Sequence, residues 1–331
     1  MTQTLNISIV VPCFNEELVL PETTLRLTSL ITSLVQRNII SPESGIVFID
    51  DGSRDSTWHI ISELSSEHEC ISGIKLSRNV GHQRALLAGL MSAKGDALIS
   101  IDADLQDDLN VVEEMIQRHA QGSEIVYGVR RKRDSDTAFK RLTARGFYKV
   151  MRFLGADIIE DHADFRLMGR RSIEDLRNFK EFNLFLRGIV PLIGYPSSLV
   201  YYDRSERLAG ISKYPLRKMI ALAFDGLTSL SSIPLRLITY AGLILFLTSI
   251  LLGAWAFSAS VFTNKTIPGW ASTVLPIYFI GGVQIFSIGI IGEYVSKIFN
   301  EVKQRPRFII SDTVGHHAKK TSKHERTEHV S

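Results

Sequence analysis

Residues 45–53 read GIVFIDDGS and residues 97–108 read ALISIDADLQDD, and these two stretches decide the fold. Each begins as a short run of apolar and β-branched residues, the pattern of a strand buried on both faces. Each run then gives way to carboxylates, beginning with Asp50 in the first and Asp102 in the second. Because the carboxyl ends of parallel strands meet at one edge of a sheet, the sequence predicts an acidic ligand site at that edge.

The rest of the first 130 residues favours the same fold class. Strand-like runs alternate with segments of helical spacing such as Leu25–Val35. This alternation is typical of an α/β domain with a parallel or mostly parallel sheet and covering helices. Ligands of such domains bind where the order of the strands reverses. Further strands are expected at Ile7–Pro12, Ile71–Leu76 and Glu124–Val129.

The second acidic stretch has the chemistry of a metal site. Asp102 and Asp104 would face the same side of an extended chain, and Gln106 continues the alternation. Such oxygen ligands suit Mg²⁺ or Mn²⁺, which one or two carboxylates hold together with substrate phosphates. Solvated loop acids are the alternative interpretation. The sequence has no G-x-x-x-x-G-K-[ST], and no G-x-G-x-x-G follows its first strand, so P-loop and dinucleotide-binding sites are excluded.

Apolar residues concentrate in the C-terminal third of the chain. Leu237–Phe262 and Thr266–Gly292 contain no charged residue, and each is long enough to cross a bilayer core about 30 Å thick. The loop between them carries only Lys265, whereas basic residues flank both outer ends, so we expect a hairpin with both chain termini in the cytoplasm. The expected domains are a cytoplasmic domain (residues 1–212), an amphipathic juxtamembrane helix (213–232), a two-helix transmembrane hairpin (233–296), and a basic segment with a disordered polar tail (297–331).

Charge and cysteine content exclude other classes of protein. The 38 basic and 35 acidic residues give a net charge of +3, which is too balanced for a nucleic-acid binder. Cys13 and Cys70 show no metal or redox spacing, so we expect two reduced thiols. Several basic side chains could pair with substrate phosphates, while a solvated surface charge or a lipid contact stays equally open for each. These candidates are Arg131, Arg133, Arg204, Arg207 and Lys213.

Six motifs occur in an order that resembles a known family. Together with the two-helix C-terminus they are similar to the family-two, GT-A-fold glycosyltransferases that act on polyprenyl phosphates. Bactoprenol glucosyltransferases are the nearest group, and dolichyl-phosphate mannose synthase is more distant. The resemblance covers residues 5 to about 308, and the absence of Q-x-x-R-W argues against a processive synthase. The motifs are VVPCFNEE (10–17), FIDDGSRDST (48–57), LSRNVGHQRALLAGL (76–90), SIDADLQDD (100–108), DHADFRLMGRR (161–171) and RLAGISKYPLRKM (207–219).

The resemblance implies a Rossmann-like nucleotide-sugar-binding domain and roles for individual residues. Asp164 matches the position usually assigned as the catalytic base. An acceptor phosphate monoester has a second pKa of about 6 and hardly needs a base, so Asp164 could instead orient a hydroxyl or Arg166, or only pair with Arg166 or Arg171. The implied groups are the metal motif (Asp102, Asp104 and Gln106, with Asp104 also catalytic), the nucleotide pocket (Pro12, Phe14, Glu16, Asp50, Asp51 and Asp102), and a phosphate-handling loop (Arg204, Arg207, Ser212 and Lys213).

Three positions depart from the family pattern. Phe14 stands where Tyr is common, which loses a hydroxyl but keeps a stacking face. Ile211 stands where Glu is expected, which leaves the detailed role of its loop open. Asp108 replaces a frequent Pro.

The implied activity is metal-dependent, inverting transfer of a sugar from a nucleotide diphosphate sugar to polyprenyl phosphate in the cytoplasmic membrane. UDP-glucose and undecaprenyl phosphate are the expected substrates, serving O-antigen or wall polysaccharide. Mannose, N-acetylhexosamine and aminoarabinose donors stay open. A non-catalytic membrane scaffold and a lipid carrier are the alternatives from other classes, although two uncharged spans are few for a transport path. Small residues in the second span leave room for a homo-oligomer through the membrane helices. They are Gly281, Gly282, Gly289 and Gly292.

Overall fold

The computed structural model describes residues 4–131, 162–181, 185–203 and 270–316, together with short helical stretches between residues 235 and 255. The chain divides into two compact units. The first contains residues 1–148, 157–214 and 304–331, and the second contains residues 149–156 and 215–303. Each unit is described by itself.

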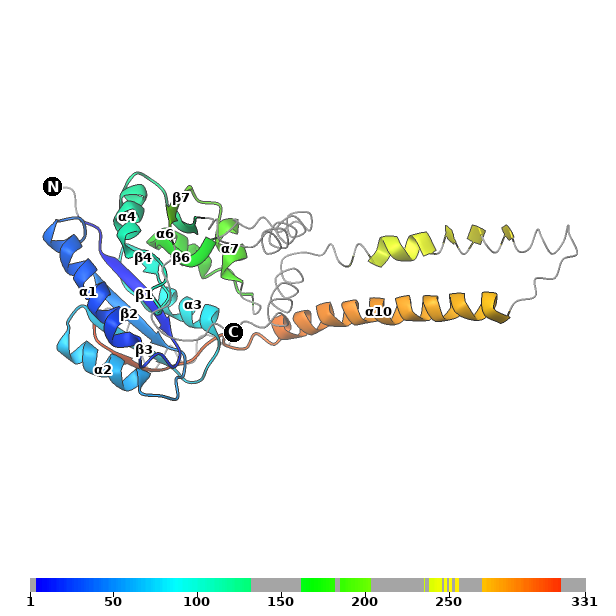
Figure 1. The fold of residues 1–331 in the computed structure, drawn as a ribbon, viewed down its shortest axis with the longest axis horizontal. Coiled ribbons are helices and arrows are strands. Elements are labelled where there is room, and N and C mark those ends of the chain that lie inside the picture. Colours follow the sequence, from blue (N-terminus) through cyan, green and yellow to red (C-terminus); the bar gives the residue numbers. More distant parts are fainter. Residues whose placement is uncertain are drawn as a thin grey trace, which may run out of the picture. The chain divides into compact units, whose positions relative to one another are not determined.

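An eight-stranded mixed sheet forms the centre of the first unit (Figure 1). Its strand order is β7-β5-β6-β4-β1-β2-β3-β8. Parallel pairs join β4, β1, β2 and β3, whereas β6 and β8 pair antiparallel with their neighbours. The strands are β1 (Ile7–Cys13), β2 (Gly45–Asp50), β3 (Ile71–Leu76), β4 (Ala97–Ser100), β5 (Ile125–Arg130), β6 (His162–Gly169), β7 (Ser197–Tyr202) and β8 (Ile310–Val314).

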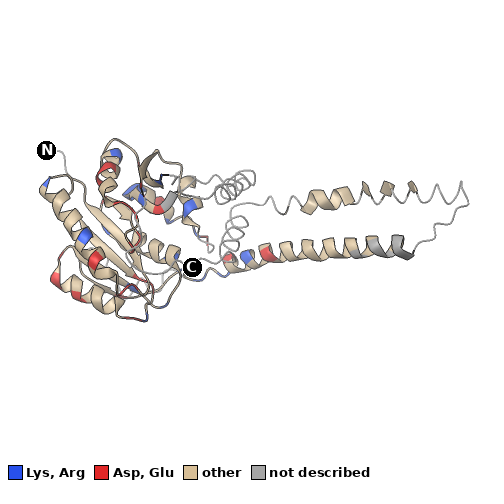
Figure 2. Cartoon of the chain, in the orientation of Figure 1, with Lys and Arg blue, Asp and Glu red and all other residues tan. Residues whose placement is uncertain are grey.

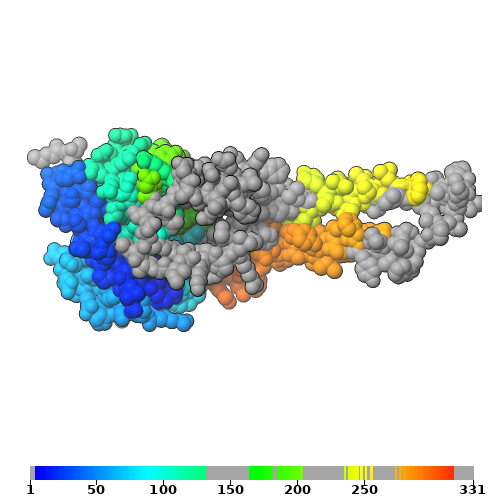
Figure 3. Space-filling model, viewed as in Figure 1, coloured from blue at the N-terminus to red at the C-terminus, as the bar shows by residue number. Residues whose placement is uncertain are grey.

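Helices cover both faces of this sheet. One hydrophobic cluster joins the sheet to α1, α2 and α4, which are the deep blue, light blue and blue-green surfaces in Figure 3. A second cluster joins the opposite face to α3, α6 and α7. The first unit is therefore a three-layer α/β domain, as the alternating pattern predicts. The helices are α1 (Leu20–Gln36), α2 (Thr57–Glu67), α3 (His82–Ser92), the short 3₁₀ helix η1 (Leu109–Val111), α4 (Val112–Ala120), α6 (Arg170–Leu176) and α7 (Leu186–Leu192).

All five strands expected from the sequence are present, and the sheet is more mixed than expected. Their buried apolar runs form β1 to β5, and Leu25–Val35 lies within α1. The strand predicted at 97–102 ends earlier, at Ser100. β6 and β7 come from segments whose irregular pattern predicted no strands.

The segment at residues 297–331 differs in part from its prediction. Instead of only a basic segment and a polar tail, it contains β8, which pairs antiparallel with β3. The amide of Ser77 donates to the carbonyl of Ile309 at 2.9 Å, and the Ser311 hydroxyl donates to the carbonyl of Lys75 at 3.1 Å. The apolar and β-branched residues of FIISDTV explain the strand. The C-terminal segment thereby covers an edge of the sheet that would otherwise be exposed.

The second unit contains α10 (Trp270–Val302), whose residues Phe279–Val302 are long and apolar enough to cross a membrane. The charged residues of α10 gather at its C-terminal end (Figure 2), and its described apolar side chains are mostly exposed. Within the described residues this is the one helix that meets the criteria for a span. The first predicted span is only partly described, and the helix expected at 213–232 lies outside the described residues, so both stay predictions.

Candidate active site

Strands β4 and β6 bring two acidic motifs together. The strands pair antiparallel with Ser100 opposite Arg166 at the end of β4. Asp102, two residues after Ser100, and Asp164, two residues before Arg166, both lie within 3.5 Å of His82 Nε2. The hydroxyl of Ser100 also donates to the carbonyl of Asp164. Because β4 lies beside β1, where the order of the parallel strands reverses, Asp102 stands at the crevice that the sequence predicted.

Asp164 is the centre of a buried charge cluster. Arg166 Nη2 donates to Asp164 Oδ1 at 2.8 Å, and Arg187 Nη2 donates to Asp164 Oδ2 at 3.1 Å. Arg187 Nε also donates to Oδ1 at 3.3 Å, so this guanidinium holds the carboxylate with two nitrogens. His82 Nε2 lies 3.4 Å from Asp102 Oδ1 and 3.5 Å from Asp164 Oδ2. Residues of α3, β6, α7 and the turn after β4 therefore meet at one point.

The partners of Asp164 determine its charge. Burial alone would raise the pKa of Asp164, but the hydrogen bond to His82 and the charges of Arg187 and Arg166 hold this pKa well below its usual range. Burial opposes protonation of His82, yet its bond to Asp164 and the charge of Asp102 raise its pKa. Asp164 is thus ionised at neutral pH and is a poor proton acceptor. The pairing of Asp164 with Arg166, which the sequence analysis named among the alternatives, is present.

Asp102 has the environment of a cation ligand. Its side chain is 34% exposed. Burial of the carboxyl and the charges of Asp107, Asp164 and Asp104 raise its pKa to about 6, although His82 acts in the opposite direction. A divalent cation would relieve this repulsion between carboxylates, so the donor set fits Mg²⁺ or Mn²⁺. Among the described residues, no three His, Cys, Asp or Glu side chains form a metal cluster by themselves, and a site completed by substrate phosphates does not require one.

The backbone after β4 corrects one prediction. The strand ends at Ser100 and the chain then turns, with the amide of Leu105 donating to the carbonyl of Asp102 at 3.2 Å and a φ of +46° at Leu105. The chain is therefore not extended from Asp102 to Gln106, and the alternation on which the prediction of a shared side rested is absent. Gln106 is 6% exposed, and its backbone N–H donates to Asp104 Oδ1 at 3.4 Å.

The strand end at β2 is a different kind of acidic site. Asp50 is fully buried; its Oδ1 accepts from the Ser53 amide at 3.0 Å, and its Oδ2 has no partner among the described residues. Asp51 accepts the amide of Val80 at 2.7 Å on one oxygen and the amide of Gly81 at 3.0 Å on the other. Asp51 thus holds the loop directly before His82, a role that the sequence did not indicate.

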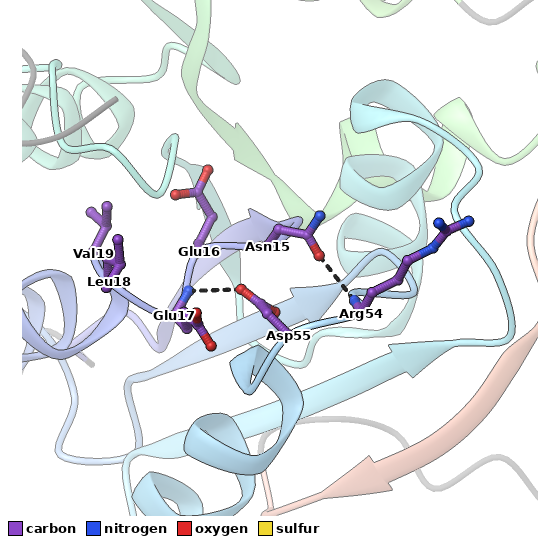
Figure 4. A pocket seen from close by; sticks show the side chains of 7 residues that line it. All are labelled: Asn15, Glu16, Glu17, Leu18, Val19, Arg54 and Asp55. Atoms are coloured by element: carbon purple, nitrogen blue, oxygen red, sulfur yellow. Dashed lines mark hydrogen bonds between the residues drawn. The ribbon is translucent and has the colours of Figure 1, made fainter. Parts of the chain in front are cut away.

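The residues expected in a nucleotide pocket lie around the carboxyl end of β1. Pro12 is buried in that strand, while Phe14 after it is 42% exposed. A pocket of about 450 Å³ opens nearby (Figure 4). Hydrogen bonds from Arg54 N to Asn15 Oδ1 and from Glu17 N to Asp55 Oδ2 join its two loops. The pocket is lined by Asn15, Glu16, Glu17, Leu18, Val19, Arg54 and Asp55.

The expected phosphate-binding residues are only partly described. Arg131 is exposed and lies 3.4 Å from Asp203 Oδ2. Its neighbour Arg130 is more deeply placed, bonding Asp107 Oδ1 at 3.2 Å and the Tyr202 hydroxyl at 3.1 Å. The other candidates, Arg133, Arg204, Arg207, Ser212 and Lys213, lie outside the described residues.

Sequence reasoning missed two residues of the central cluster. His82 lies within the motif LSRNVGHQRALLAGL, and its position as the first residue after a glycine loop was the available signal. Arg187 lies in no motif, and only the folded structure brings it to Asp164.

Known proteins with similar sequences match nearly the whole chain. A model described as glycosyl transferase family 2 matches residues 8–177, and one described as the GtrB C-terminal hairpin matches residues 233–298. Over 306 residues the chain is 52% identical to the uncharacterized glycosyltransferase YkoT of Bacillus subtilis (strain 168), covering 92% of this chain and 90% of YkoT. It is 40% identical over 308 residues to the SfII prophage-derived bactoprenol glucosyl transferase of Shigella flexneri, covering 92% and 97%. It is 38% identical over 309 residues to the prophage bactoprenol glucosyl transferase homolog of Escherichia coli (strain K12), covering 92% and 98%.

Proposed function

The chain belongs to glycosyl transferase family 2, and we propose that it transfers one sugar from a UDP-sugar to a polyprenyl phosphate, with inversion at the anomeric carbon. Its GT-A-like α/β fold and its membership of the family agree with the sequence-based resemblance. Glucose and undecaprenyl phosphate are the first candidates, since relatives 40% and 38% identical carry the name bactoprenol glucosyl transferase. Mannose, N-acetylhexosamine and aminoarabinose are the other candidate sugars. The proposal rests on one observation: Asp102 and Asp164 lie close together, since His82 Nε2 is 3.4 Å from Asp102 Oδ1 and 3.5 Å from Asp164 Oδ2.

Asp102 and Asp104 are the proposed ligands of a Mg²⁺ or Mn²⁺ ion, and the donor diphosphate completes their set. When bound, the ion supplies positive charge for the leaving diphosphate. Gln106 was expected as a third ligand, and its burial makes it the weakest candidate of the three. Asp104 acts through this ion in the proposal, which is the sense in which it is catalytic.

The proposed reaction needs no general base. An acceptor phosphate oxygen attacks the anomeric carbon, the bond from that carbon to the diphosphate breaks, and its electron pair leaves with UDP. A phosphate monoester has a second pKa of about 6, so the attacking oxygen is already ionised near pH 7. The low pKa of Asp164, which its arginine and histidine partners cause, fits a positioning role and disfavours proton abstraction.

The nucleotide is proposed to lie along the carboxyl ends of β1 and β2. The exposed ring of Phe14 can stack on the base, and the unpartnered oxygen of Asp50 can accept from a base or ribose donor. Pro12 and Glu16 border the same region, and Asp51 supports it by holding the loop before α3.

The proposed location is the cytoplasmic membrane. The apolar helix α10 and the match to a C-terminal hairpin support membrane attachment. We extend this to a two-span hairpin with both termini and the active site in the cytoplasm. Attachment raises the effective concentration of an acceptor that cannot leave the bilayer. Arg131, Arg133, Arg204, Arg207, Ser212 and Lys213 stay candidates for phosphate or lipid contacts, and self-association through the membrane helices stays part of the proposal.

A donor screen tests the proposal. The full chain in detergent is incubated with undecaprenyl phosphate, Mg²⁺ and a panel of labelled nucleotide sugars, and label in the lipid phase is counted. Label from one donor that disappears in Asp104→Ala is the expected result. If no donor gives label while the chain still binds UDP with metal, the proposed reaction is wrong.

A further inference from the structure

The side chain of Arg187 reaches solvent, but the backbone beside it is held by two other elements of the domain. It is the second residue of α7, and both backbone groups of the residue before it are held from other elements. The amide of Leu186 donates to Gln83 Oε1 at 3.1 Å, and its carbonyl accepts from Arg166 Nη1 at 3.4 Å. The first turn of α7 is thus fixed to α3 and β6, and the guanidinium of Arg187 is fixed to Asp164.

Asp164 does not need Arg187 for charge balance. Arg166 is fully buried, pairs with Asp164 at 2.8 Å, and supplies the one positive charge that the carboxylate requires. Arg130 pairs in the same way with buried Asp107 at 3.2 Å. Arg187 is therefore a second cation on one carboxylate, and its side chain is 39% exposed, whereas that of Asp164 is 6% exposed.

Asp102, the other acid whose charge acts on Arg187, has another partner in the proposed reaction. Asp102 and Asp104 carry two negative charges, which a divalent metal ion neutralises. Once the metal is bound, the cluster keeps the positive charge of Arg187 at a partly exposed position. Nε and one N–H of Nη2 are directed at Asp164, so Nη1 and the second N–H of Nη2 can bind a phosphate group through two donors.

We infer that Arg187 binds the phosphate monoester of the lipid acceptor, an inference that rests on the proposed function. The geometry favours the acceptor over the donor diphosphate. In an inverting displacement the nucleophile approaches opposite the leaving group, so the cation for the acceptor must stand apart from the metal carboxylates yet close to them. Arg187 bonds Asp164, and His82 Nε2 lies within 3.5 Å of both Asp164 and Asp102. Arg187 is thus placed beside the proposed metal carboxylates by a carboxylate that is not itself a proposed metal ligand.

The test compares Arg187→Gln and Arg187→Lys with the unchanged full chain in detergent. For Arg187→Gln we expect the KM for undecaprenyl phosphate to rise about tenfold or more, the loss of one charge-assisted contact, while the KM for the donor changes less than about threefold. Arg187→Lys keeps the charge but not the two-nitrogen fork, so a rise of several-fold is expected. Arg187→Lys also tests the inference if Arg187→Gln does not fold. Arg118→Gln is the matched control, because Arg118 pairs with Glu114 on the solvent-exposed face of α4.

Binding of undecaprenyl phosphate in the presence of UDP and Mg²⁺, followed by native mass spectrometry, separates this inference from the proposed function. Binding that is lost in Arg187→Gln supports the inference even if no donor sugar is transferred. A rise in the donor KM alone would assign Arg187 to the diphosphate and overturn it. A fall in kcat with both KM values and acceptor binding unchanged would also overturn it, because Arg187 would then only position Asp164.

Discussion

The carboxyl ends of β2 and β4 look alike in the sequence and differ in the folded domain. Each is a buried apolar strand followed by aspartates. At the end of β2, both oxygens of Asp51 accept backbone amides. At the end of β4, Asp102 is crowded by other carboxylates and stays partly exposed. An acid at the end of a strand can therefore have a structural role or a ligand-binding role, and its hydrogen-bond and charge partners indicate which one better than its position does.

The two ends are nevertheless connected. Asp51 holds the amides of Val80 and Gly81, and the next residue is His82, which lies between Asp102 and Asp164. The β2 end therefore determines where α3 begins, and α3 delivers a side chain to the β4 end. Substitutions of Asp102 or Asp104 should remove chemistry, while substitution of Asp51 should mainly reduce stability.

The largest effect is expected for Asp164→Asn. The substitution keeps the shape of the side chain but removes the negative charge between Arg166 and Arg187. The kcat for sugar transfer should therefore fall about 10³-fold, the upper end of the range seen when one preorganised electrostatic contact is lost. Breaking a buried ion pair also costs about 3–5 kcal/mol, so thermal melting must be followed beside the transfer assay. Turnover close to that of the unchanged chain would remove Asp164 from the active site.

Asp104→Ala should lower transfer by about 10²-fold, because one of the two proposed metal carboxylates is lost. The loss should be partly recovered at high Mn²⁺, since Asp102 stays in place. The measurement is the rate of transfer against metal concentration, with Asp108→Asn as the control, whose side chain accepts the amide of Asn110 instead. Equal loss at every metal concentration would show that Asp104 acts in another way.

The sequence predicted the fold more fully than the site. The runs at β1 to β5 are nearly continuous buried strands, a strong signal, and the aspartates after β4 pointed to the correct edge of the sheet. The antiparallel pairing of β6 with β4 could not be predicted, and it brings the segment that carries Asp164 beside the end of β4. Arg187 was missed for the same reason, because its contact with Asp164 spans two elements and follows no local pattern. β8 follows α10 in the chain and pairs with β3, which is distant in the sequence, so no local pattern indicated it.

Metal affinity should depend on pH through Asp102. Its pKa of about 6 means that a proton competes with the cation below that pH. The apparent Kd for Mn²⁺ with UDP should therefore rise toward tenfold per pH unit as the pH falls below about 6, and should level off above about 7. Calorimetry between pH 5 and pH 8, in buffers of different ionisation enthalpy, measures both the affinity and the protons released. An affinity that is constant from pH 5 to pH 7 would contradict this environment for Asp102.

The smallest effect on activity, and the sharpest test of the comparison, is expected for Asp51→Asn. Asn offers one acceptor where Val80 and Gly81 present two amides, so one buried N–H faces another donor, at a cost of about 1–3 kcal/mol. The melting temperature should fall by several degrees, while kcat changes only a few-fold, because His82 shifts but the metal carboxylates do not. Asp108→Asn is again the matched control. If Asp51→Asn abolished donor binding without lowering the melting temperature, Asp51 would itself be a ligand-binding residue, as Asp102 is proposed to be.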